Sequence, residues 1–518
     1  MVASMKRLLR QAWGATHGRA IATVFVALAT TIGTAHGSGA TGARAASRPA
    51  TIPSAADLRG RLDSLRRQLD RYRVGGDLRT HLFFRHADRP TLRATLASLI
   101  AAESALRNVA AEADRDVTEA YTVLDWCEAA LARLHAGPAP KVSPSDRSPP
   151  VVCLDGGLLR AGPTPPIVTG WCVSDASGIG GGNAAECVDL AACLGARMFL
   201  DARSDVTKDI AEALAVRAAF LGVAYHDTPP ASGLKARDGR DAVLHLPSDA
   251  RDPAAADRWR LELWSRAVRG DRVMAFAWEP SILLRPWLVE ATAFCGLGFA
   301  RLGDVLRYFP GRSDILVVGS PPKASQTAEA LADAQVPADV AQIEALADAD
   351  RMGHCRLLIL AGVEDADPSV RDAIRRFRDA GNVLLAVGPC LRGVPRTGPG
   401  GIPLDLHVEA DRYDPLCAYV RRLRDRGTIL ADQIVPSAAD GGPVKSLRTR
   451  TVRDETGRIL VYLANGSDVP RPLILRHRGM AVAQRAEELI AGGSLEPARS
   501  PVVLPPFAVW LLRLPGGP

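Results

Sequence analysis

The spacing of apolar residues divides the chain into regions with different periods. Over residues 54–135 leucines recur three or four positions apart, as in Leu58, Leu62, Leu65 and Leu69. This spacing places them on one face of an amphipathic helix, so it predicts a helical region over 54–135. The next segment, 136–150, holds five prolines, which is typical of an extended linker between domains.

Beyond the linker, short apolar runs alternate with helix-like stretches. The runs in "PIVTGWCVSD", "ARMFLDA", "VAYHD", "AVLHLPSD" and "RVMAFAWEPS" are typical of buried strands, and we count the apolar run at 151–154 as a further strand. Strands that alternate with helices form parallel sheets. A complete (β/α)8 barrel needs about 250 residues, so we predict an incomplete (β/α) barrel over 151–311.

The alternation continues over 312–427, where "DILVVGS", "CRLLILAG" and "NVLLAVG" are separated by helix-like segments. This predicts a Rossmann-like or flavodoxin-like domain. No G-x-G-x-x-G follows its first strand, so nucleotide binding has no support. Residues 428–518 change to short strands separated by turn residues, which predicts an antiparallel β-sandwich. The expected fold class is therefore a multidomain α/β protein.

Residues 1–45 have the order of a secretory signal peptide. Basic residues precede the apolar run "AIATVFVALATTIGTA", and small residues follow it. We therefore expect an extracytoplasmic protein, periplasmic or secreted. The apolar run is shorter than the roughly 20 residues that span a bilayer, but an uncleaved signal anchor stays an alternative.

Composition narrows the classes of partner. The net charge is +7, part of it in the signal segment, and the remainder is too small to indicate a nucleic-acid partner. Nine cysteines form no C-x-x-C pair and lie mostly in apolar runs. We expect most of them to be small buried side chains, and we expect no metal and no cofactor.

Acidic residues mark the ends of the strands in 151–311. These residues are Asp175, Asp201, Asp227, Asp249 and Glu279. Because the carboxyl ends of parallel strands lie at one edge of a sheet, we expect these side chains to converge where such folds build their sites. Helix capping is the alternative for each aspartate. It explains Glu279 less well, because Pro280 and Pro286 disturb the start of the next helix.

The order of these regions resembles glycoside hydrolase family 42, the β-galactosidase family with a trimerisation domain. The resemblance is carried by "RLLILAGVEDADPSVRDAIRRFRDAGNVLLAVGP", by "GRILVYLANGSD" and by the ending "ELIAGGSLEPARSPVVLPPFAVWLLRL". It implies a barrel that takes carbohydrate as its ligand, a middle domain with the class I amidotransferase fold, and assembly as a homo-oligomer.

The catalytic pattern of that family is incomplete in this chain. Barrel glycosidases of this kind place the acid/base glutamate after an asparagine, and no asparagine here precedes glutamate. The strand expected to carry the nucleophile is "AVLHLPSD", which has no glutamate. Glycoside hydrolysis needs two carboxyl groups about 5 to 10 Å apart, and Asp249 and Glu279 are the best available catalytic pair. We expect sugar contacts from Asp175, Asp201, His226, Asp227 and Trp278.

Two hypotheses of different class therefore stay open. One is an exported glycoside hydrolase with a rearranged catalytic pair. The other is a non-catalytic glycan-binding or assembly protein on the same scaffold. For Glu279 itself the alternatives to catalysis are a hydrogen bond to a sugar hydroxyl beside Trp278, or an ion pair with Arg285.

One further motif lies in the middle domain. "AVGPCLRG" places Cys390 after a strand with glycines on either side, similar to the nucleophile elbow of class I glutamine amidotransferases. That nucleophile needs a positioned histidine, and the nearby His407 does not lie in the late His-x-Glu of that family. We therefore expect no amidotransferase activity.

Overall fold

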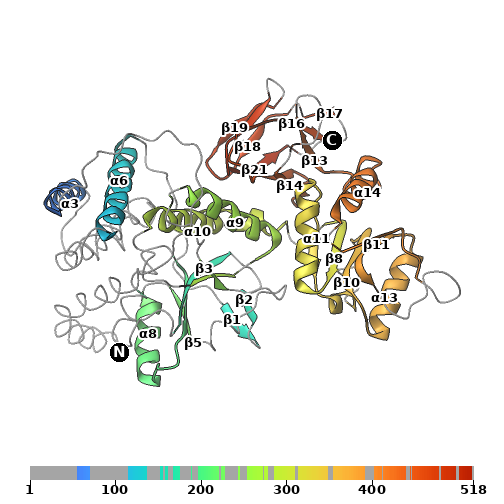
Figure 1. The fold of residues 1–518 in the computed structure, drawn as a ribbon, viewed down its shortest axis with the longest axis horizontal. Helices are drawn as coiled ribbons and strands as arrows, with labels where there is room; N and C mark the ends of the chain where they lie inside the picture. Colours follow the sequence, from blue (N-terminus) through green and yellow to red (C-terminus); the bar gives the residue numbers. More distant parts are fainter. Residues whose placement is uncertain are drawn as a thin grey trace.

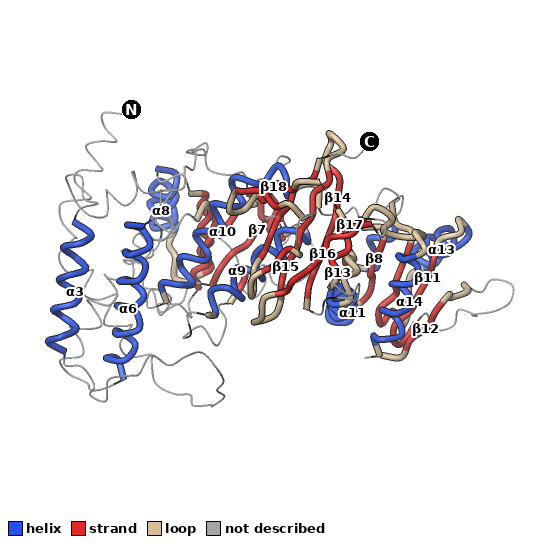
Figure 2. Tube along the Cα trace, turned by 90° about the horizontal axis from the view of Figure 1, so that it is seen from above, coloured by secondary structure: helices blue, strands red, loops and turns tan. Residues whose placement is uncertain are grey.

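The computed structural model describes residues 55–70, 115–136 and, with gaps, 152–515; the larger gaps are 175–187, 189–195, 228–242, 246–251, 278–284, 348–353 and 391–401. Figures 1 and 2 show a helical pair at one end of the molecule and an α/β unit at the other, with a parallel sheet and the C-terminal strands between them. The predicted signal peptide (1–45) and nearly all of the predicted linker (136–150) lie outside the described residues. Within the described part, no helix combines the length and the apolar character that a membrane span requires.

The helical pair consists of α3 (Ala55–Asp70) and α6 (Arg115–Ala136). The predicted leucine stripe of α3 is buried at Leu58, Leu62 and Leu65, and it shares one core with Leu124 and Leu131 of α6. At the surface of the pair, the Arg61 guanidinium donates to both carboxylate oxygens of Glu128, at 2.9 and 2.8 Å. The helical prediction is confirmed for these two segments, and residues 71–114 lie outside the described part.

The first parallel sheet has the order β5-β4-β3-β7-β6. Its strands are β3 (Val168–Ser174), β4 (Met198–Ala202), β5 (Ala224–Asp227), β6 (Val243–Leu244) and β7 (Val273–Ala277). All four pairings are parallel, and the first strand, β3, pairs with the last, β7. The alternation read from the sequence therefore predicted these five strands correctly.

Among the described residues, three helices accompany this sheet: α8 (Lys208–Phe220), α9 (Ala255–Arg269) and α10 (Pro286–Leu306). α9 buries Trp259, Leu263 and Trp264 at helical spacing and ends at Gly270, which has φ of 109°. Glycines let α10 come close to its neighbours, because a Cβ on Gly298 would lie 2.8 Å from the Trp264 ring.

The apolar run at 151–154 does not join the parallel sheet. It forms β1 (Val152–Asp155), which pairs antiparallel with β2 (Leu158–Ala161) in a separate hairpin. The reason is local: only Gly156 and Gly157 separate Asp155 from Leu158, and a Gly-Gly pair favours the tight turns that close two-residue hairpins.

The second parallel sheet has the order β12-β11-β10-β8-β9. It contains β8 (Ile315–Gly319), β9 (Asp339–Ala341), β10 (Leu357–Val363), β11 (Val383–Cys390) and β12 (Leu406–Val408). Numbered along the chain this order is 2-1-3-4-5, the flavodoxin-like order. Its helices are α11 (Pro321–Asp333), the 3-10 helix η5 (Ile343–Ala347), α13 (Pro368–Asp379) and α14 (Tyr413–Asp425).

The C-terminal region consists of two antiparallel sheets that share one core. The strands are β13 (Ile434–Ser437), β14 (Leu447–Arg453), β15 (Ile459–Asn465), β16 (Arg471–His477), β17 (Met480–Ala481), β18 (Ala486–Glu488), β19 (Gly493–Leu495), β20 (Val502–Leu504) and β21 (Val509–Leu514). One sheet has the order β14-β15-β21-β18-β19, and the other is centred on β16. Leu463 and Leu512 of the first pack with Leu473 and Leu475 of the second, as predicted from the sequence.

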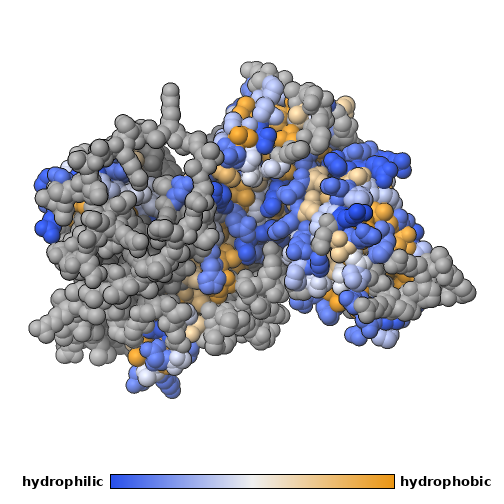
Figure 3. All heavy atoms as spheres, in the orientation of Figure 1, coloured by the Kyte–Doolittle hydropathy of each residue, from blue (hydrophilic) through white to orange (hydrophobic). Residues whose placement is uncertain are grey.

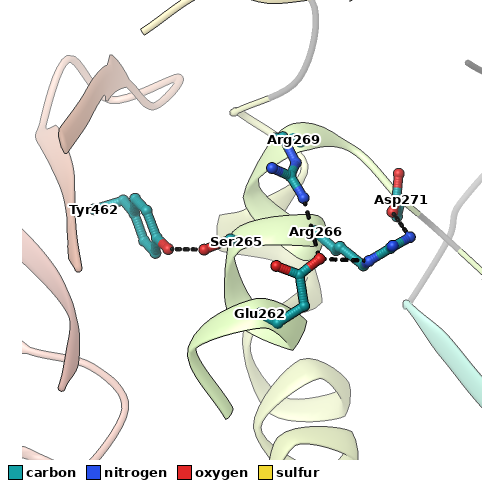
Figure 4. A network of polar contacts seen from close by, with 6 residues as sticks. All are labelled: Glu262, Ser265, Arg266, Arg269, Asp271 and Tyr462. Carbon is teal, nitrogen blue, oxygen red and sulfur yellow. Dashed lines mark hydrogen bonds and ion pairs between the residues drawn. The ribbon is translucent and has the colours of Figure 1, made fainter. Parts of the chain in front are cut away.

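The C-terminal sheet also packs on the helices of the first unit. Leu460 and Tyr462 of β15 belong to the same core as Leu263 and Trp264 of α9. Figure 4 shows the Tyr462 hydroxyl reaching across to Ser265, with 2.7 Å between the two oxygens. Both side chains are buried, so this junction is a packed interface.

Candidate functional site

The two faces of the first sheet have different surroundings. Trp171, Phe199 and Phe276 lie in the large core that includes α9 and α10. Among the described residues, the alternate positions form a second core made only of strand residues, namely Val168, Cys172, Met198, Leu200, Ala202, Val243, Val273 and Ala275. We call these the helix-facing side and the strand-only side. Each candidate side chain at the carboxyl edge belongs to one of them.

Asp201 lies on the helix-facing side near the end of β4. Its carboxylate accepts two hydrogen bonds from the Arg203 guanidinium, Nε to Oδ1 at 2.8 Å and Nη2 to Oδ2 at 2.7 Å. The Tyr225 hydroxyl of β5 donates to Oδ2 at 3.1 Å. The side chains of Asp201 and Arg203 are fully buried. Because both oxygens of Asp201 are engaged, this carboxylate ties the ends of β4 and β5 together.

The protonation of this cluster follows from burial and charge. Burial raises the pKa of Tyr225 well above its ordinary value, and the negative charge of Asp201 raises it further. Hydrogen bonding to Asp201 raises the pKa of Arg203, in spite of the opposing effect of burial. Tyr225 therefore stays a neutral donor and Arg203 a cation over the physiological range. The tyrosine ring is also held by stacking on Phe199, with centroids 6.2 Å apart.

His226 lies on the opposite, strand-only side. It pairs in register with Leu200, a member of the strand-only core. Its Nε2 is buried and has no hydrogen-bond partner among the residues that the structure describes. Burial lowers the pKa of His226 below its ordinary value. A neutral imidazole with an unused ring nitrogen at the carboxyl edge of a sheet can accept or donate a hydrogen bond to a ligand hydroxyl.

The remaining predicted site residues divide into two groups. Asp227 is exposed and pairs in register with Asp201, so it shares the helix-facing side. Asp175, Asp249, Trp278 and Glu279 lie outside the described residues, and their predicted roles stay predictions. The reason for pairing Asp249 with Glu279 was the expected adjacency of their strands, and that adjacency is confirmed because β6 pairs with β7.

Sequence reasoning missed Arg203 and Tyr225. A signal for Arg203 was present, because an arginine two positions after a strand-end aspartate lies within reach of its carboxylate. Tyr225 carried no signal of its own. Its contact with Asp201 depends on the register between β4 and β5, which aligns Phe199 with Tyr225.

The histidine near the Cys390 motif of the middle domain contacts the backbone of that motif. His407 lies on β12 beside β11, and its Nε2 is 2.8 Å from the carbonyl oxygen of Gly388. Gly388 has φ of 72°, which favours glycine. The imidazole therefore engages the backbone next to the motif, and the absence of amidotransferase activity stays a prediction. Across the described residues, no group of three or more His, Cys, Asp or Glu side chains could hold a metal ion.

Comparisons with known proteins find similarity in structure and none in sequence. No protein-family model matches this chain, and no curated protein matches it. The fold is similar to the apo exo-carrageenase GH42 from Bacteroides ovatus, with TM-score 0.49 and 9% identity over 90% of this chain and 100% of that one. It is also similar to the β-galactosidase from Rahnella sp. R3, with TM-score 0.35 and 11% identity over 49% of this chain and 50% of that one.

A third similarity is to the rhamnosidase from Novosphingobium sp. PP1Y, with TM-score 0.32 and 14% identity over 63% of this chain and 39% of that one. This chain thus spans about half the length of the Rahnella enzyme and less of the rhamnosidase. At these scores and identities the similarities do not establish family membership.

Proposed function

We propose that this protein binds carbohydrate at the carboxyl edge of an incomplete (β/α) barrel of the glycoside hydrolase type. The observation that carries the proposal is the strand pairing of the first sheet. β3 pairs with β4, and β4 pairs with β5. β6 pairs with β7, and β7 pairs with β3. In a barrel each strand pairs with the next and the last closes on the first. The observed order is that of a barrel with units left out between β5 and β6.

The strand-only side corresponds to the interior of such a barrel, which side chains from the strands fill. His226 and Ala277 lie on this side near the carboxyl edge, and Trp278 and Glu279 follow Ala277 directly in the sequence. A sugar suits this set of groups. Its hydroxyls hydrogen-bond to an imidazole and a carboxylate, while an aromatic ring packs against its C–H groups.

Binding is better supported than hydrolysis. Among the described residues, the acidic side chains at the ends of β4 and β5 are Asp201 and Asp227, and both belong to the helix-facing side. A two-carboxylate mechanism would therefore depend on Asp249 and Glu279. This distribution favours the second hypothesis, a non-catalytic glycan-binding or assembly protein, over an efficient glycosidase.

The experiment combines sugar binding by calorimetry with turnover of nitrophenyl glycosides. We expect weak turnover at most, and we expect Glu279→Gln to lose sugar binding more than stability. The matched control is Glu409→Gln, an exposed glutamate of the flavodoxin-like unit, which should change neither. Loss of an essential catalytic carboxyl would cost several orders of magnitude in rate. Strong turnover that survives both Glu279→Gln and Asp249→Asn would show that the site lies elsewhere.

Export and assembly belong to the same proposal. The basic and apolar N-terminal segment supports export, which fractionation and N-terminal sequencing of the cell-associated protein would test. The likeness of 312–427 to a trimerisation domain supports a homo-oligomer, which light scattering would test. Recovery in the cytosol, or a monomer at micromolar concentration, would contradict these two parts separately.

A further inference from the structure

A cavity of about 380 Å³ lies where three parts of the molecule meet. Its walls come from the end of α9, from α11 and β9 of the flavodoxin-like unit, and from β14 and β15 of the C-terminal sheet. On the face shown in Figure 3, hydrophilic side chains gather where these parts meet. A cavity of this volume is large enough to hold a ligand of monosaccharide size.

Two hydroxyl groups that line this junction cavity have one O–H donor more than their mutual hydrogen bond uses. Ser265 and Tyr462 line it, and their hydroxyls are hydrogen-bonded to each other at 2.7 Å. Two hydroxyls hold two protons, and one bond between them uses only one. Burial raises the pKa of Tyr462 to about 12, so both groups stay protonated. One O–H of the pair is therefore available to an acceptor in the cavity.

Arg450 supplies charged donors at the same place. Its side chain is 7% exposed, and its Nη2 donates to Asp339 at 2.6 Å. That contact uses one of the five N–H donors of a guanidinium. Arg450 is the cross-strand partner of Tyr462, so the two side chains leave the sheet on the same face, and both line the cavity. Arg448 lies two positions before it on β14, on the same side of the strand, and also lines the cavity.

The acids that line the inner part of the cavity already have partners. Asp339 accepts from Arg450 and from the backbone N–H of Ser313, at 3.1 Å. Asp271 pairs with Arg266, with 3.4 Å between Oδ2 and Nη1 (Figure 4). Glu329 and Glu344 are exposed at the rim. Arg448 also has a carboxylate partner, because its Nε lies 3.6 Å from Oδ1 of Asp333. The inner wall thus offers N–H and O–H donors whose charges are already paired, and an oxyanion would bind to the donors that these ion pairs leave unused.

We propose that the junction cavity binds a small molecule of about monosaccharide size that carries an oxyanion, either a carboxylate or a phosphate. Arg450, Arg448 and the Ser265–Tyr462 pair would hold the oxyanion. The cavity lies beside Asp271, which precedes β7, and so at the amino end of the sheet. The proposed sugar site lies at the carboxyl end, so this second site is independent of it. Because three parts line the cavity, the ligand would bridge them.

The test is a titration of the full chain with sodium phosphate, glucuronate and, as the neutral comparison, glucose. We expect phosphate or glucuronate to bind and to raise the melting temperature, with the tighter of the two identifying the source of the oxyanion. Glucose should not bind at this cavity. Glu279→Gln should leave anion binding unchanged, which separates this site from the proposed sugar site.

Three variants and one control locate the site. Tyr462→Phe keeps the packing and removes one hydroxyl, and we expect it to weaken anion binding about threefold to tenfold. Arg448→Gln should weaken it about tenfold or more, as should the double variant Arg450→Gln with Asp339→Asn, which removes both charges of the pair together. The control is Arg453→Gln, on the other side of the same strand. Absence of anion binding, or equal binding in all four variants, would overturn the proposal.

Discussion

The described part of the chain contains two five-stranded parallel sheets, and the surroundings of their faces differ. The flavodoxin-like sheet has a core on each face, and each core includes residues of its own helices, such as Ile374 of α13 on one and Leu416 of α14 on the other. The first sheet has α9 and α10 on one face, while the core described on its other face is built from strand residues alone. Both sheets are parallel and buried, so composition does not distinguish them.

Strand order explains the difference. In the order 2-1-3-4-5 the connections cover both faces with helices, which leaves ligands the crevice at the ends of the strands. In the first sheet β7 pairs with β3, and the described helices α9 and α10 lie on one face. In the proposed barrel this face is the outside, and the strand-only side is the interior. A ligand site on the first sheet therefore depends on which side a residue faces. This separates His226 from Asp201 although they lie on adjacent strands.

The largest expected effect concerns the buried ion pair of the first sheet. Arg203→Met leaves the Asp201 carboxylate buried without its guanidinium, and we expect a loss of about 3 to 5 kcal/mol in unfolding free energy. The matched ion pair in the other sheet is Arg378–Asp405, in which each of the two side chains is about one quarter exposed. Arg378→Met should cost about 1 kcal/mol or less.

Urea unfolding followed by tryptophan fluorescence measures the first loss, because five of the eight tryptophans lie in 151–311. Trp171, Trp259, Trp264, Trp278 and Trp287 belong to 151–311, and 312–427 contains no tryptophan. Far-UV circular dichroism follows the Arg378 variant. A second replacement, Asp201→Leu on the Arg203→Met background, should recover part of the loss. Equal losses for Arg203→Met and Arg378→Met would contradict the difference in burial.

Each parallel sheet contains a glycine at a point where the backbone of the neighbouring strand comes close. A Cβ on Gly319 of β8 would lie 1.9 Å from the carbonyl oxygen of Ala361, and Gly319 has φ of 156°. A Cβ on Gly170 of β3 would lie 2.5 Å from the carbonyl oxygen of Met198. We expect Gly319→Ala to cost about 3 kcal/mol or more and Gly170→Ala about 1 to 3 kcal/mol. Circular dichroism and tryptophan fluorescence measure the two losses, and the reverse order would contradict the geometry.

The sequence predicted the strands because each is an apolar run bounded by polar or turn residues. It did not predict the sides they face. In a strand buried on both faces, as in "RMFLDA", alternate positions are apolar on both sides, so the period of two carries no direction. The pairing of β7 with β3 joins segments about 100 residues apart. The local pattern of apolar and polar residues does not contain information on such long-range pairing. The contacts that fix Asp201 follow from register and were therefore found only in the structure.

The hydrogen bond from Tyr225 tests the link between β4 and β5. Tyr225→Phe removes the bond to Asp201 and keeps the ring on Phe199, so we expect a loss of about 1 kcal/mol. The control in the other sheet is Tyr419→Phe on α14, for which no side-chain hydrogen bond from the hydroxyl is described. Fluorescence-detected urea unfolding should separate the two variants. A Tyr225 variant as stable as the wild-type chain would show that the register between β4 and β5 does not depend on this bond.

The smallest effect is a pH dependence that tests which side His226 faces. Burial lowers the pKa of His226 in the folded chain, whereas the unfolded chain binds a proton near the ordinary value of about 6.5. Below that value the unfolded state holds more protons, so stability falls as the pH falls. Between about pH 7.5 and about pH 6 the His226 contribution should be less than about 1 kcal/mol. His226→Gln should remove it, which urea unfolding at the two pH values would detect as a flatter profile. An unchanged profile would mean that the imidazole titrates as it does in water, and the strand-only side would then not be a buried interior.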